Sequence, residues 1–587
     1  MSSLERASRW IEQDPNPTDR AELEALVGAA RSGDAAAEKD VAERFVGSLE
    51  FGTAGLRGVI GAGESRMNTA VILRTTFGLA RYLLDHPEAD VKTRGVAIGY
   101  DGRRRSREFA ESAVGVLSTL GIRSYLSEGV CPTPVLAYAV TRLNAAAGIM
   151  VTASHNPPEY NGYKVYWGNG AQIIPPHDTG IAACVEAAPP ANKIEDASLD
   201  DARAKGLLEA FPNDLESSYL DAVQALSLKR SGARDAAIVY TPLHGVGNRL
   251  VRETLTRAGF SKVFSVPQQA EPDGEFPTVA FPNPEEKGAL DLAYALAEEK
   301  GADLILASDP DVDRLAAAVR LPPSERGSWK QLTGNQVGVL LGHYLLTEGP
   351  RAGNRTALAS CVSSPQLGVI ARALGVHYEE TLTGFKWIAN RAMELERTEN
   401  MSFVFGYEEA LGYTVGPLVR DKDGISAALL FAELWAGLRA ERRTVFDELE
   451  QIARNWGAFV SSQVSITMKG KDGLEQIRAA MARLRSTSAW QFGPAAVESL
   501  SDVKFGTKRD ADGKESRLVL PPSDVLMYAL AGGSRIIARP SGTEPKLKIY
   551  FDVCESISGS EPLTEAESRA NTRMTAITAA FRAHAGV

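Results

Sequence analysis

The chain has 587 residues, 44% of them hydrophobic and 24% charged, a composition typical of a globular protein. At about 150 residues per domain, this length predicts roughly four domains. The 64 basic and 74 acidic side chains give a net charge of −10, which argues against a nucleic-acid partner. A small basic pocket for an anion is still compatible with that charge.

The cysteine pattern and the apolar segments bear on where the protein works. None of the four cysteines has the spacing of a zinc knuckle or a redox dithiol, so a reducing, cytoplasmic location is expected. Residues 1–17 lack the apolar run of a signal peptide. The most apolar segment, 425–438, contains Glu433 and is too short to span a bilayer, so it is predicted to be a buried helix and no membrane partner is expected.

The first fifty residues are predicted to be helical. Segments 21–30 and 35–46 have apolar positions three to four residues apart with acids between them, and Asp14-Pro15-Asn16-Pro17 interrupts the helix ahead of them. Segment 51–63, FGTAGLRGVIGAG, then contains five glycines. Because glycine tolerates unusual backbone angles, this segment favours a backbone that bends around something small.

A pattern of strands and amphipathic helices then recurs three times. Each repeat has a strand, a helix ended by glycine, a second strand, and a third strand that runs into a loop rich in polar residues. The first strands lie at 95–103, 236–247 and 355–368, the glycines are Gly121, Gly259 and Gly375, and the polar loops follow strands in 148–157, 304–314 and 403–413. This alternation predicts three related α/β domains with mainly parallel mixed sheets, and ligands of such sheets bind at the strand ends where the polar loops fall.

The remaining segments are predicted to connect or follow these repeats. Polar stretches at 188–205 and 320–330 are predicted to be connections. From about residue 455, apolar runs at 459–468, 516–521, 534–540 and 546–553 precede a final helix, which predicts a separate α+β domain.

Ser154 is a candidate nucleophile. It lies where an apolar strand stops, followed by His155 and two prolines, so its hydroxyl is expected on a stiff, exposed turn. Lys164, in a strand-like run ten residues further on, is a candidate general acid or base. The alternative is a serine that only stabilises its own turn.

A run of alternating acids is a candidate metal site. Asp309, Asp311 and Asp313 follow an apolar strand and would repel one another without a cation, and hard oxygen ligands suit Mg²⁺. A calcium-binding EF-hand is excluded because Arg314 and Arg320 occupy positions that need glycine and glutamate. A solvated acidic turn is the alternative.

Two further segments carry candidate binding groups. Segment 539–550 places Arg539, Ser541, Thr543, Lys546 and Lys548 around a turn, a composition that suits a phosphate cradle, or else an ordinary turn with solvated lysines. In the third repeat, Glu408 and Glu409 could accept hydrogen bonds from sugar hydroxyls or lie on the surface, and Lys386 could bind an anion.

Taken together and in order, the motifs FGTAGLRG, TASHNP, DPDVDR, GYEEALGY and RPSGTEPK resemble those of the α-D-phosphohexomutase family. The match runs from about residue 40 to the end, and WIEQDPNPTDRAELEAL, GYEEALGY and TGFKWIAN are most similar to its phosphoglucomutase-2/phosphopentomutase branch. The resemblance implies three related α/β domains plus a C-terminal α+β domain around a central cleft. The expected domains are 1–205 with the N-terminal helices and phosphoserine, 206–325 for metal binding, 326–450 for sugar recognition and 451–587 for phosphate binding.

The resemblance also implies roles for single residues. Ser154 would carry the transferable phosphate, and Asp309, Asp311 and Asp313 would hold one Mg²⁺ together with that phosphate. The other implied roles are Arg57 and Arg314 at the reaction centre, Lys164 as general base or acid with His155 close by, Glu408 and Lys386 at the sugar, and Arg539, Ser541, Gly542, Thr543 and Lys548 at the phosphate that is not transferred.

The implied reaction is that of a phosphoglucomutase, with a phosphoserine enzyme, a bisphosphosugar intermediate and glucose 1,6-bisphosphate as primer. The expected partner is a small phosphosugar, and the protein is expected to be a monomer or a homodimer. Ala410 stands where glucose-preferring relatives often carry serine, which leaves phosphopentomutase activity open. Three further functions stay open at this point: a glucose-1,6-bisphosphate synthase, a phosphatase and a non-catalytic sugar-phosphate sensor.

Overall fold

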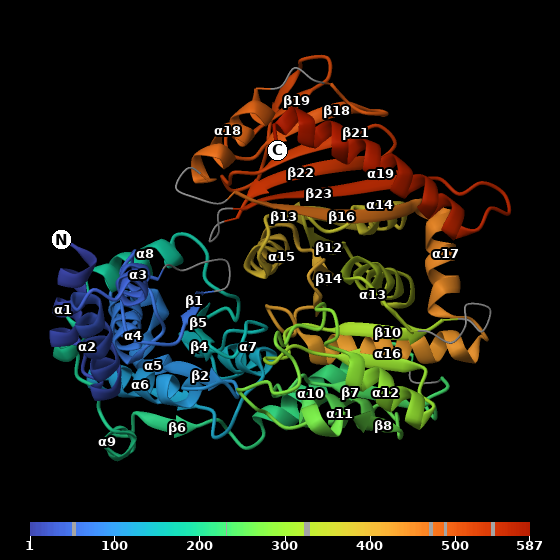
Figure 1. Cartoon of the computed structure of the whole chain (residues 1–587). Coiled ribbons are helices and arrows are strands. Elements are labelled where there is room, and N and C mark those ends of the chain that lie inside the picture. Colours follow the sequence, from blue (N-terminus) through green and yellow to red (C-terminus); the bar gives the residue numbers. More distant parts are fainter. Residues whose placement is uncertain (50–54, 230–231, 322–328, 469–472, 487–489, 542–545) are drawn as a thin grey trace. The chain divides into compact units, whose positions relative to one another are not determined.

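The computed structural model describes residues 1–587 except 50–54, 230–231, 322–328, 469–472, 487–489 and 542–545. Its chain falls into two compact units. The first unit comprises residues 1–332 and 411–437, and the second comprises 333–410 and 438–587. Figure 1 follows the chain from the N-terminal helices in blue to the C-terminal helix in red.

The N-terminal helices are present as expected. They are α1 (Ser3–Gln13), α2 (Pro17–Arg31) and α3 (Ala35–Arg44), and they enclose a small core that includes Leu23 and Val41. The break at 14–17 is also the start of α2, because the Asn16 side chain accepts hydrogen bonds from the backbone N–H groups of Thr18 and Asp19.

The first sheet has six strands in the order β1-β5-β4-β2-β3-β6. The strands are β1 (Leu56–Val59), β2 (Val96–Tyr100), β3 (Ser124–Leu126), β4 (Ala147–Val151), β5 (Tyr160–Trp167) and β6 (Leu208–Ala210). The helices around it are α4 (Thr69–Leu84), α5 (Val91–Arg94), α6 (Ser106–Thr119), α7 (Thr133–Arg142), α8 (His177–Glu186) and α9 (Leu199–Ala204). Because β6 pairs with β3, this sheet extends past residue 205.

The second sheet has five strands in the order β11-β10-β9-β7-β8. The strands are β7 (Ile238–Thr241), β8 (Val263–Ser265), β9 (Leu304–Ala307), β10 (Ala316–Arg320) and β11 (Trp329–Gln331), with helices α10 (Leu215–Ala225), α11 (Asn248–Arg257) and α12 (Asp291–Lys300). The prediction of a connection at 320–330 is wrong for its first residue and its last two residues, which belong to strands. Arg320 on β10 and Trp329 on β11 are partners in the β10–β11 ladder. The Arg320 guanidinium lies 4.9 Å from the centre of the Trp329 ring, a cation–π contact that favours this pairing.

The third sheet has the order β13-β12-β14-β15. The strands are β12 (Arg355–Ser360), β13 (His377–Thr381), β14 (Ser402–Glu408) and β15 (Gly412–Val415), and the helices are α13 (Gly334–Glu348), α14 (Gln366–Ala373), α15 (Phe385–Glu399), α16 (Gly424–Ala440) and α17 (Val445–Trp456). Helix α16 contains the apolar segment 425–438 and is largely buried, as predicted. Within the described ranges, no helix combines the length and the apolar character needed to cross a membrane.

The threefold repeat is confirmed by strand order. In each sheet, the first strand of the repeat lies in the middle and is parallel to the other two: β2 between β4 and β3, β7 between β9 and β8, and β12 between β14 and β13. Gly121, Gly259 and Gly375 have φ of +71°, +92° and +67°, so each ends its helix in the left-handed region.

The C-terminal domain is α+β, as predicted. Its antiparallel sheet has the order β16-β23-β22-β21-β18-β19-β20, with β17 paired to β18. The strands are β16 (Ala458–Thr467), β17 (Gln491–Phe492), β18 (Ala495–Asp502), β19 (Thr507–Asp510), β20 (Glu515–Arg517), β21 (Leu526–Leu530), β22 (Ser534–Pro540) and β23 (Lys546–Glu555), and helices α18 (Gly473–Arg485) and α19 (Leu563–Ala585) pack on the sheet (Figure 1). Only residues 516–517 of the predicted run 516–521 lie in a strand, β20, and β18 and β21 were not expected.

Candidate active site

Ser154 lies in the loop that leaves the carboxyl end of β4. Its backbone has φ of +53°, a left-handed conformation that is uncommon for a residue other than glycine, and its side chain is buried. The backbone N–H donates to Thr152 Oγ1 at 2.8 Å, and Ser154 Oγ donates to Asp309 Oδ2 at 2.7 Å. The predicted proximity of His155 is also found, because His155 Nδ1 lies 3.2 Å from Ser154 Oγ.

The three aspartates follow β9 and form one buried cluster. Carboxylate oxygens of Asp309, Asp311 and Asp313 all lie within 4.8 Å of one another. Lys164, on β5, donates from Nζ to Asp311 Oδ2 at 2.7 Å and to Asp313 Oδ2 at 2.8 Å. The first unit therefore brings the predicted serine, lysine and three acids together although they are up to 159 positions apart in the sequence.

The donor set of this cluster fits a divalent cation. Among the described residues, Asp311 Oδ1 and Asp313 Oδ1 are buried oxygens without a hydrogen-bond partner, which is a costly arrangement unless a cation is bound there. The oxygens are carboxylates of the kind that Mg²⁺ prefers, and they lie beside the Ser154 hydroxyl. Asp309, Asp311 and Asp313 could thus hold a magnesium ion.

Burial and neighbouring charges shift the pKa values of the clustered aspartates in different directions. Burial and the neighbouring Asp311 and Asp313 raise the pKa of Asp309 well above its usual range. Burial also acts to raise the pKa of Asp313, but Lys164, Lys422 and Arg314 outweigh it and the pKa is lowered. Lys422 Nζ lies 3.3 Å from Asp313 Oδ2, a contact that the sequence did not indicate.

The cations predicted for the reaction centre lie around the same loop. Arg57, on β1, donates to Asn156 Oδ1 at 3.0 Å, and Arg314 Nε lies 3.9 Å from Asp309 Oδ2. Burial and the positive charges of Arg314 and Arg57 lower the pKa of His155 well below its ordinary value. The imidazole beside Ser154 is therefore neutral near pH 7.

Arg103 is a site residue that sequence reasoning missed. From the loop after β2, it donates to the backbone carbonyls of Ser154 and Asn156, each at 2.5 Å, and of Pro157 at 2.8 Å. Its side chain is fully buried and forms an ion pair with Asp101 at 3.3 Å. Arg103 follows the first strand of the first repeat, so its position at a strand end was the signal that could have identified it.

Thr133 is a second missed residue of the centre. At the start of α7, its Oγ1 donates to Asp311 Oδ2 at 2.6 Å and its backbone N–H donates to the Asp311 carbonyl oxygen at 2.9 Å. This residue fixes the orientation of one of the proposed metal ligands.

The described glycines of segment 51–63 allow close packing within the protein, and the expected bend around a small molecule stays a prediction. A Cβ at Gly55 would lie 2.4 Å from the Tyr163 carbonyl oxygen, and one at Gly63 would lie 2.9 Å from Arg44 Cβ. Glycine is required there so that β5 and α3 can approach the backbone. Gly52 lies outside the described residues.

In the second unit, residues 406–410, the predicted sugar loop, pack against the start of α15. Glu408 Oε1 accepts a hydrogen bond from the Gly384 backbone N–H at 2.7 Å, and Lys386 lies in the first turn of that helix. Glu409 accepts from Ser360 Oγ and Ser363 Oγ, each at 3.2 Å, and burial raises its pKa.

The predicted phosphate cradle lies in the same unit as the sugar loop. Arg539 on β22 and Lys548 on β23 are directly opposite in the antiparallel ladder, so their side chains share one face of the sheet. Arg539 donates to Thr383 Oγ1, next to the Gly384 that binds Glu408. Ser541 donates from its backbone to the Lys546 carbonyl oxygen at 2.8 Å, whereas the predicted Gly542 and Thr543 lie outside the described residues.

Arg535, which was not predicted, connects the sheet of the phosphate cradle to the sheet of the sugar loop. It donates to Asp552 Oδ2 on β23 and to Glu380 Oε1 on β13, each at 2.7 Å. This arginine, whose side chain is 11% exposed, thereby joins the C-terminal sheet to the sheet that carries the sugar loop.

The fold and the first-unit site define a class of enzyme. Three related α/β domains and an α+β domain carry a hydroxyl, a cluster of acids and several cations at strand ends, a set that suits phosphoryl transfer. Family models of phosphoglucomutase/phosphomannomutase match in order: α/β/α domain I at 48–191, domain II at 217–321, domain III at 333–455 and the C-terminal domain at 469–558.

Known proteins give the same result. A phosphopentomutase of Pongo abelii is 37% identical over 583 residues, covering 95% of this chain and 92% of the relative. A glucose 1,6-bisphosphate synthase of Homo sapiens is 35% identical over 570 residues, covering 93% and 89%. The open form of the phosphoglucomutase parafusin from Paramecium is 18% identical with a TM-score of 0.64, covering 92% of this chain and 96% of that structure, and it supports the fold alone.

This chain belongs to the phosphoglucomutase/phosphomannomutase family, the α-D-phosphohexomutases. It is an enzyme of the mutase type, an intramolecular phosphotransferase.

Proposed function

We propose that this enzyme interconverts glucose 1-phosphate and glucose 6-phosphate, with Ser154 as the carrier of the transferred phosphoryl group. The observation that carries the proposal is the 2.7 Å contact of Ser154 Oγ with Asp309 inside a cluster of three carboxylates and two lysines. Phosphoryl transfer depends mainly on positioning and charge neutralisation, and this cluster offers both.

The reaction has two transfers. In the first, the bond between phosphorus and Ser154 Oγ breaks, a bond to the 6-hydroxyl oxygen forms, and the hydroxyl proton passes to Oγ. The bisphosphosugar then reorients, the phosphoryl group at position 1 returns to Oγ, and the Oγ proton passes to the sugar oxygen. Lys164 and His155, which lie beside Asp311 and Ser154, would move these protons. A bisphosphosugar primer would phosphorylate an enzyme that has lost its phosphate.

Magnesium fits the proposed centre. Asp309, Asp311 and Asp313 would hold it with the Ser154 phosphate, and it would supply positive charge toward the phosphoryl oxygens. Arg57 and Arg314 would orient and neutralise the same group.

A second set of groups would hold the rest of the substrate. Arg539 and Lys548, with Ser541, Gly542 and Thr543, would bind the phosphate that is not transferred, and Glu408 and Lys386 would contact the sugar. This proposal requires that the two sets face a shared cleft. A mutase needs such a second anion site, whereas a phosphatase does not.

Phosphopentomutase activity is the second candidate. Ala410 offers no hydroxyl in the sugar loop, and one similar protein is named phosphopentomutase. Rates on glucose 1-phosphate, ribose 1-phosphate and mannose 1-phosphate, each with Mg²⁺ and primer, separate these activities. Activity that requires an external phosphoryl donor and accumulates bisphosphate would instead indicate a synthase, the name of another similar protein.

Replacement of the carrier tests the proposal. Ser154→Ala is expected to lower mutase turnover by roughly a thousandfold or more, because no group can hold the phosphoryl between transfers. The thermal unfolding temperature should stay close to that of the original enzyme, and labelling from a ³²P bisphosphosugar should disappear. Full turnover in this variant would show that another residue carries the phosphoryl group.

A further inference from the structure

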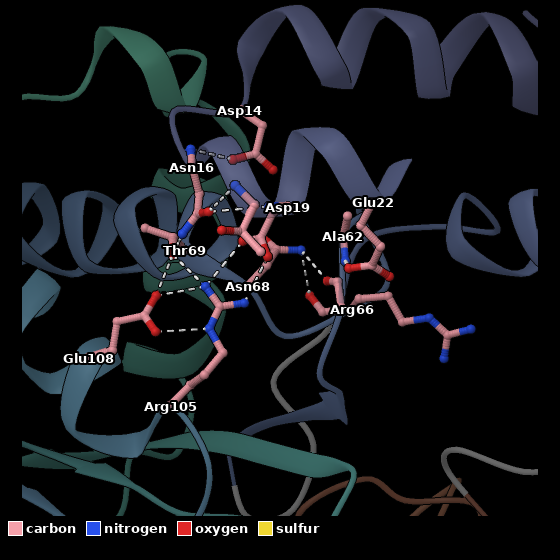
Figure 2. A network of polar contacts seen from close by, with 12 residues as sticks. Asp14, Asn16, Asp19, Glu22, Ala62, Arg66, Asn68, Thr69, Arg105 and Glu108 are labelled. Atoms are coloured by element: carbon pink, nitrogen blue, oxygen red, sulfur yellow. Dashed lines mark hydrogen bonds and ion pairs between the residues drawn. The ribbon is translucent and has the colours of Figure 1, made fainter. Parts of the chain in front are cut away.

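Helix α2 contacts both loops that hold the Ser154 region. Two of its acids, Asp19 and Glu22, are three residues apart and therefore lie on one face of the helix. Glu22 contacts the loop that follows Arg57, and Asp19 contacts the loop that contains Arg103. Figure 2 shows this network, with Glu22 beside Ala62 and Arg105 pointing toward Asp19, Thr69 and Glu108.

The first contact fixes the backbone of Ala62 on both sides. Ala62 N–H donates to Glu22 Oε2 at 3.2 Å, and the Ala62 carbonyl oxygen accepts from Arg44 Nη1 at 3.0 Å. Arg44 and Glu22 form an ion pair at 2.5 Å. An added Cβ would lie 2.9 Å from Arg44 Cβ at Gly63 and 3.3 Å from Glu22 Oε1 at Gly61, so the two glycines allow a close approach to these side chains.

Ala62 is linked to Arg57 through a short, hydrogen-bonded turn. Gly61 N–H donates to the Met67 carbonyl oxygen at 3.1 Å, and Met67 N–H donates to the Val59 carbonyl oxygen at 2.8 Å. Val59 is the last residue of β1, on which Arg57 reaches Asn156, two residues beyond Ser154. A shift of Ala62 would therefore displace the strand that carries Arg57.

The second contact fixes the Arg103 loop. Arg105 donates to both carboxylate oxygens of Asp19, at 2.9 and 3.1 Å, and to Thr69 Oγ1 at 2.8 Å. Arg105 has φ of +61° and lies two residues from Arg103, which holds the carbonyls of the Ser154 loop. Asp19 is only 4% exposed in its side chain, so this ion pair is shielded from water.

We propose that Asp19 and Glu22 are positioning residues for the mutase reaction: the N-terminal helices hold Arg57 and Arg103 in register with Ser154. The inference rests on the proposed function, because it assigns a role toward the phosphoryl carrier. It gives the N-terminal helices, which precede the first matched family domain, a part in turnover beyond stability.

Glu22→Gln tests the first contact while preserving the size of the side chain. We expect kcat to fall about tenfold with KM for glucose 1-phosphate within twofold, because small misplacement of a catalytic group slows transfer more than it weakens binding. In an Arg57→Lys background the same change should lower kcat less than twofold, since Glu22 acts through Arg57. An equal fall in both backgrounds would overturn the proposal.

Matched variants separate positioning from folding. Lys39→Ala removes an exposed ion pair with Glu43 on α3 and should leave kcat unchanged. Asp19→Asn should lower kcat like Glu22→Gln, and this effect should shrink in an Arg103→Lys background. All assays are run below the measured unfolding temperature of each variant, so that a loss of folded protein is not counted as a loss of rate.

The outcomes also distinguish this inference from the proposed function. Full turnover in Ser154→Ala would remove the mutase assignment itself. Loss of turnover in Ser154→Ala, together with unchanged kcat in both Glu22→Gln and Asp19→Asn, would leave the mutase assignment standing and overturn only the positioning role.

Discussion

Arg103 illustrates how a side chain can shape the proposed reaction centre through hydrogen bonds to backbone carbonyls. Its guanidinium donates to three carbonyls of the Ser154 loop and to that of Tyr160. A lysine keeps the charge but has a single ammonium group, which cannot reach several carbonyls in this planar arrangement. The shape of the arginine therefore matters more than its charge.

Arg103→Lys is expected to lower kcat by about tenfold, with little change in KM, because the Ser154 loop loses its fixed geometry. Steady-state kinetics with glucose 1-phosphate measure the effect. Arg107→Lys is the control, since Arg107 is 72% exposed and pairs only with Glu111 on its own helix among the described residues. Equal losses in the two variants would contradict the positioning by Arg103.

The aspartate cluster makes a second prediction at this scale. Asp311→Asn removes a carboxylate with an unpaired buried oxygen, so the Mg²⁺ concentration for half-maximal activity should rise about a hundredfold. Chelator should abolish the activity of the original enzyme, and added Mg²⁺ should restore it. Asp303→Asn, a substitution of an acid that pairs with Arg320, is the control. Unchanged activity in chelator would contradict the metal site.

The residues of the centre differ in how well the sequence predicts them. Ser154 and the three aspartates stand at the ends of apolar strands, so local pattern alone marked them. The three consecutive arginines at 103–105 are indistinguishable by sequence but have different environments in the fold. Arg103 is buried, Arg105 pairs with Asp19, and Arg104 is half exposed. Their difference depends on loops from elsewhere in the chain, which no local pattern contains.

At the scale of elements, α16 shows why a buried helix can contain an acid. Glu433 is 1% exposed, and its Oε1 accepts from the backbone N–H groups of Leu228 and Lys229 at 2.8 and 2.9 Å. Its Oε2 lies 3.1 Å from Arg234 Nη2. Glu433 thus accepts the hydrogen bonds of backbone N–H groups in a loop that packs on the helix.

Glu433→Gln is expected to lower the free energy of unfolding by about 2–4 kcal/mol, because an amide N–H₂ would face Arg234 and leave a buried cation poorly paired. Urea titration followed by tryptophan fluorescence measures the change. Glu216→Gln, at an exposed pair with Arg249, should cost less than about 1 kcal/mol. A similar small cost for Glu433→Gln would show that the loop does not depend on this acid.

Elements were predicted well where the pattern is periodic and less well elsewhere. The three repeats follow from strands alternating with helices, and they share one strand order, with the first strand of each repeat between the other two. Strands β18 and β21 contain residues such as Glu498 and Met527 in weakly β-like runs, and pairing within an antiparallel sheet determines them. The β10–β11 hairpin was missed because its ends flank a proline-rich stretch.

At the scale of the whole molecule, the proposed chemistry and the proposed recognition lie in different compact units. The first unit contains Ser154 and the aspartates, and the second contains Glu408, Arg539 and Lys548. Substitutions in the first unit should therefore act mainly on kcat, and those in the second mainly on KM.

Lys548→Ala tests this division. KM for glucose 1-phosphate should rise about tenfold or more while kcat stays within threefold, because a phosphate that is not transferred is bound equally in the ground and transition states. Lys508→Ala, in the same domain but 41% exposed beside Asp510, is the control. A fall in kcat with unchanged KM would contradict the assignment of this lysine to binding.

Arg535 has a consequence for ligand affinity. Arg535 connects the strand of Arg539 to the sheet that carries Glu408, so under the proposed function the sugar contacts and the phosphate contacts would form one preorganised surface. A compound that occupies both the sugar site and the phosphate site would make both sets of contacts and lose translational freedom once. Two separate fragments would each pay that loss of translational freedom on binding. Inhibitors built from either fragment alone should therefore bind weakly. The binding free energy of the linked compound should be more favourable than the sum of the binding free energies of the two fragments.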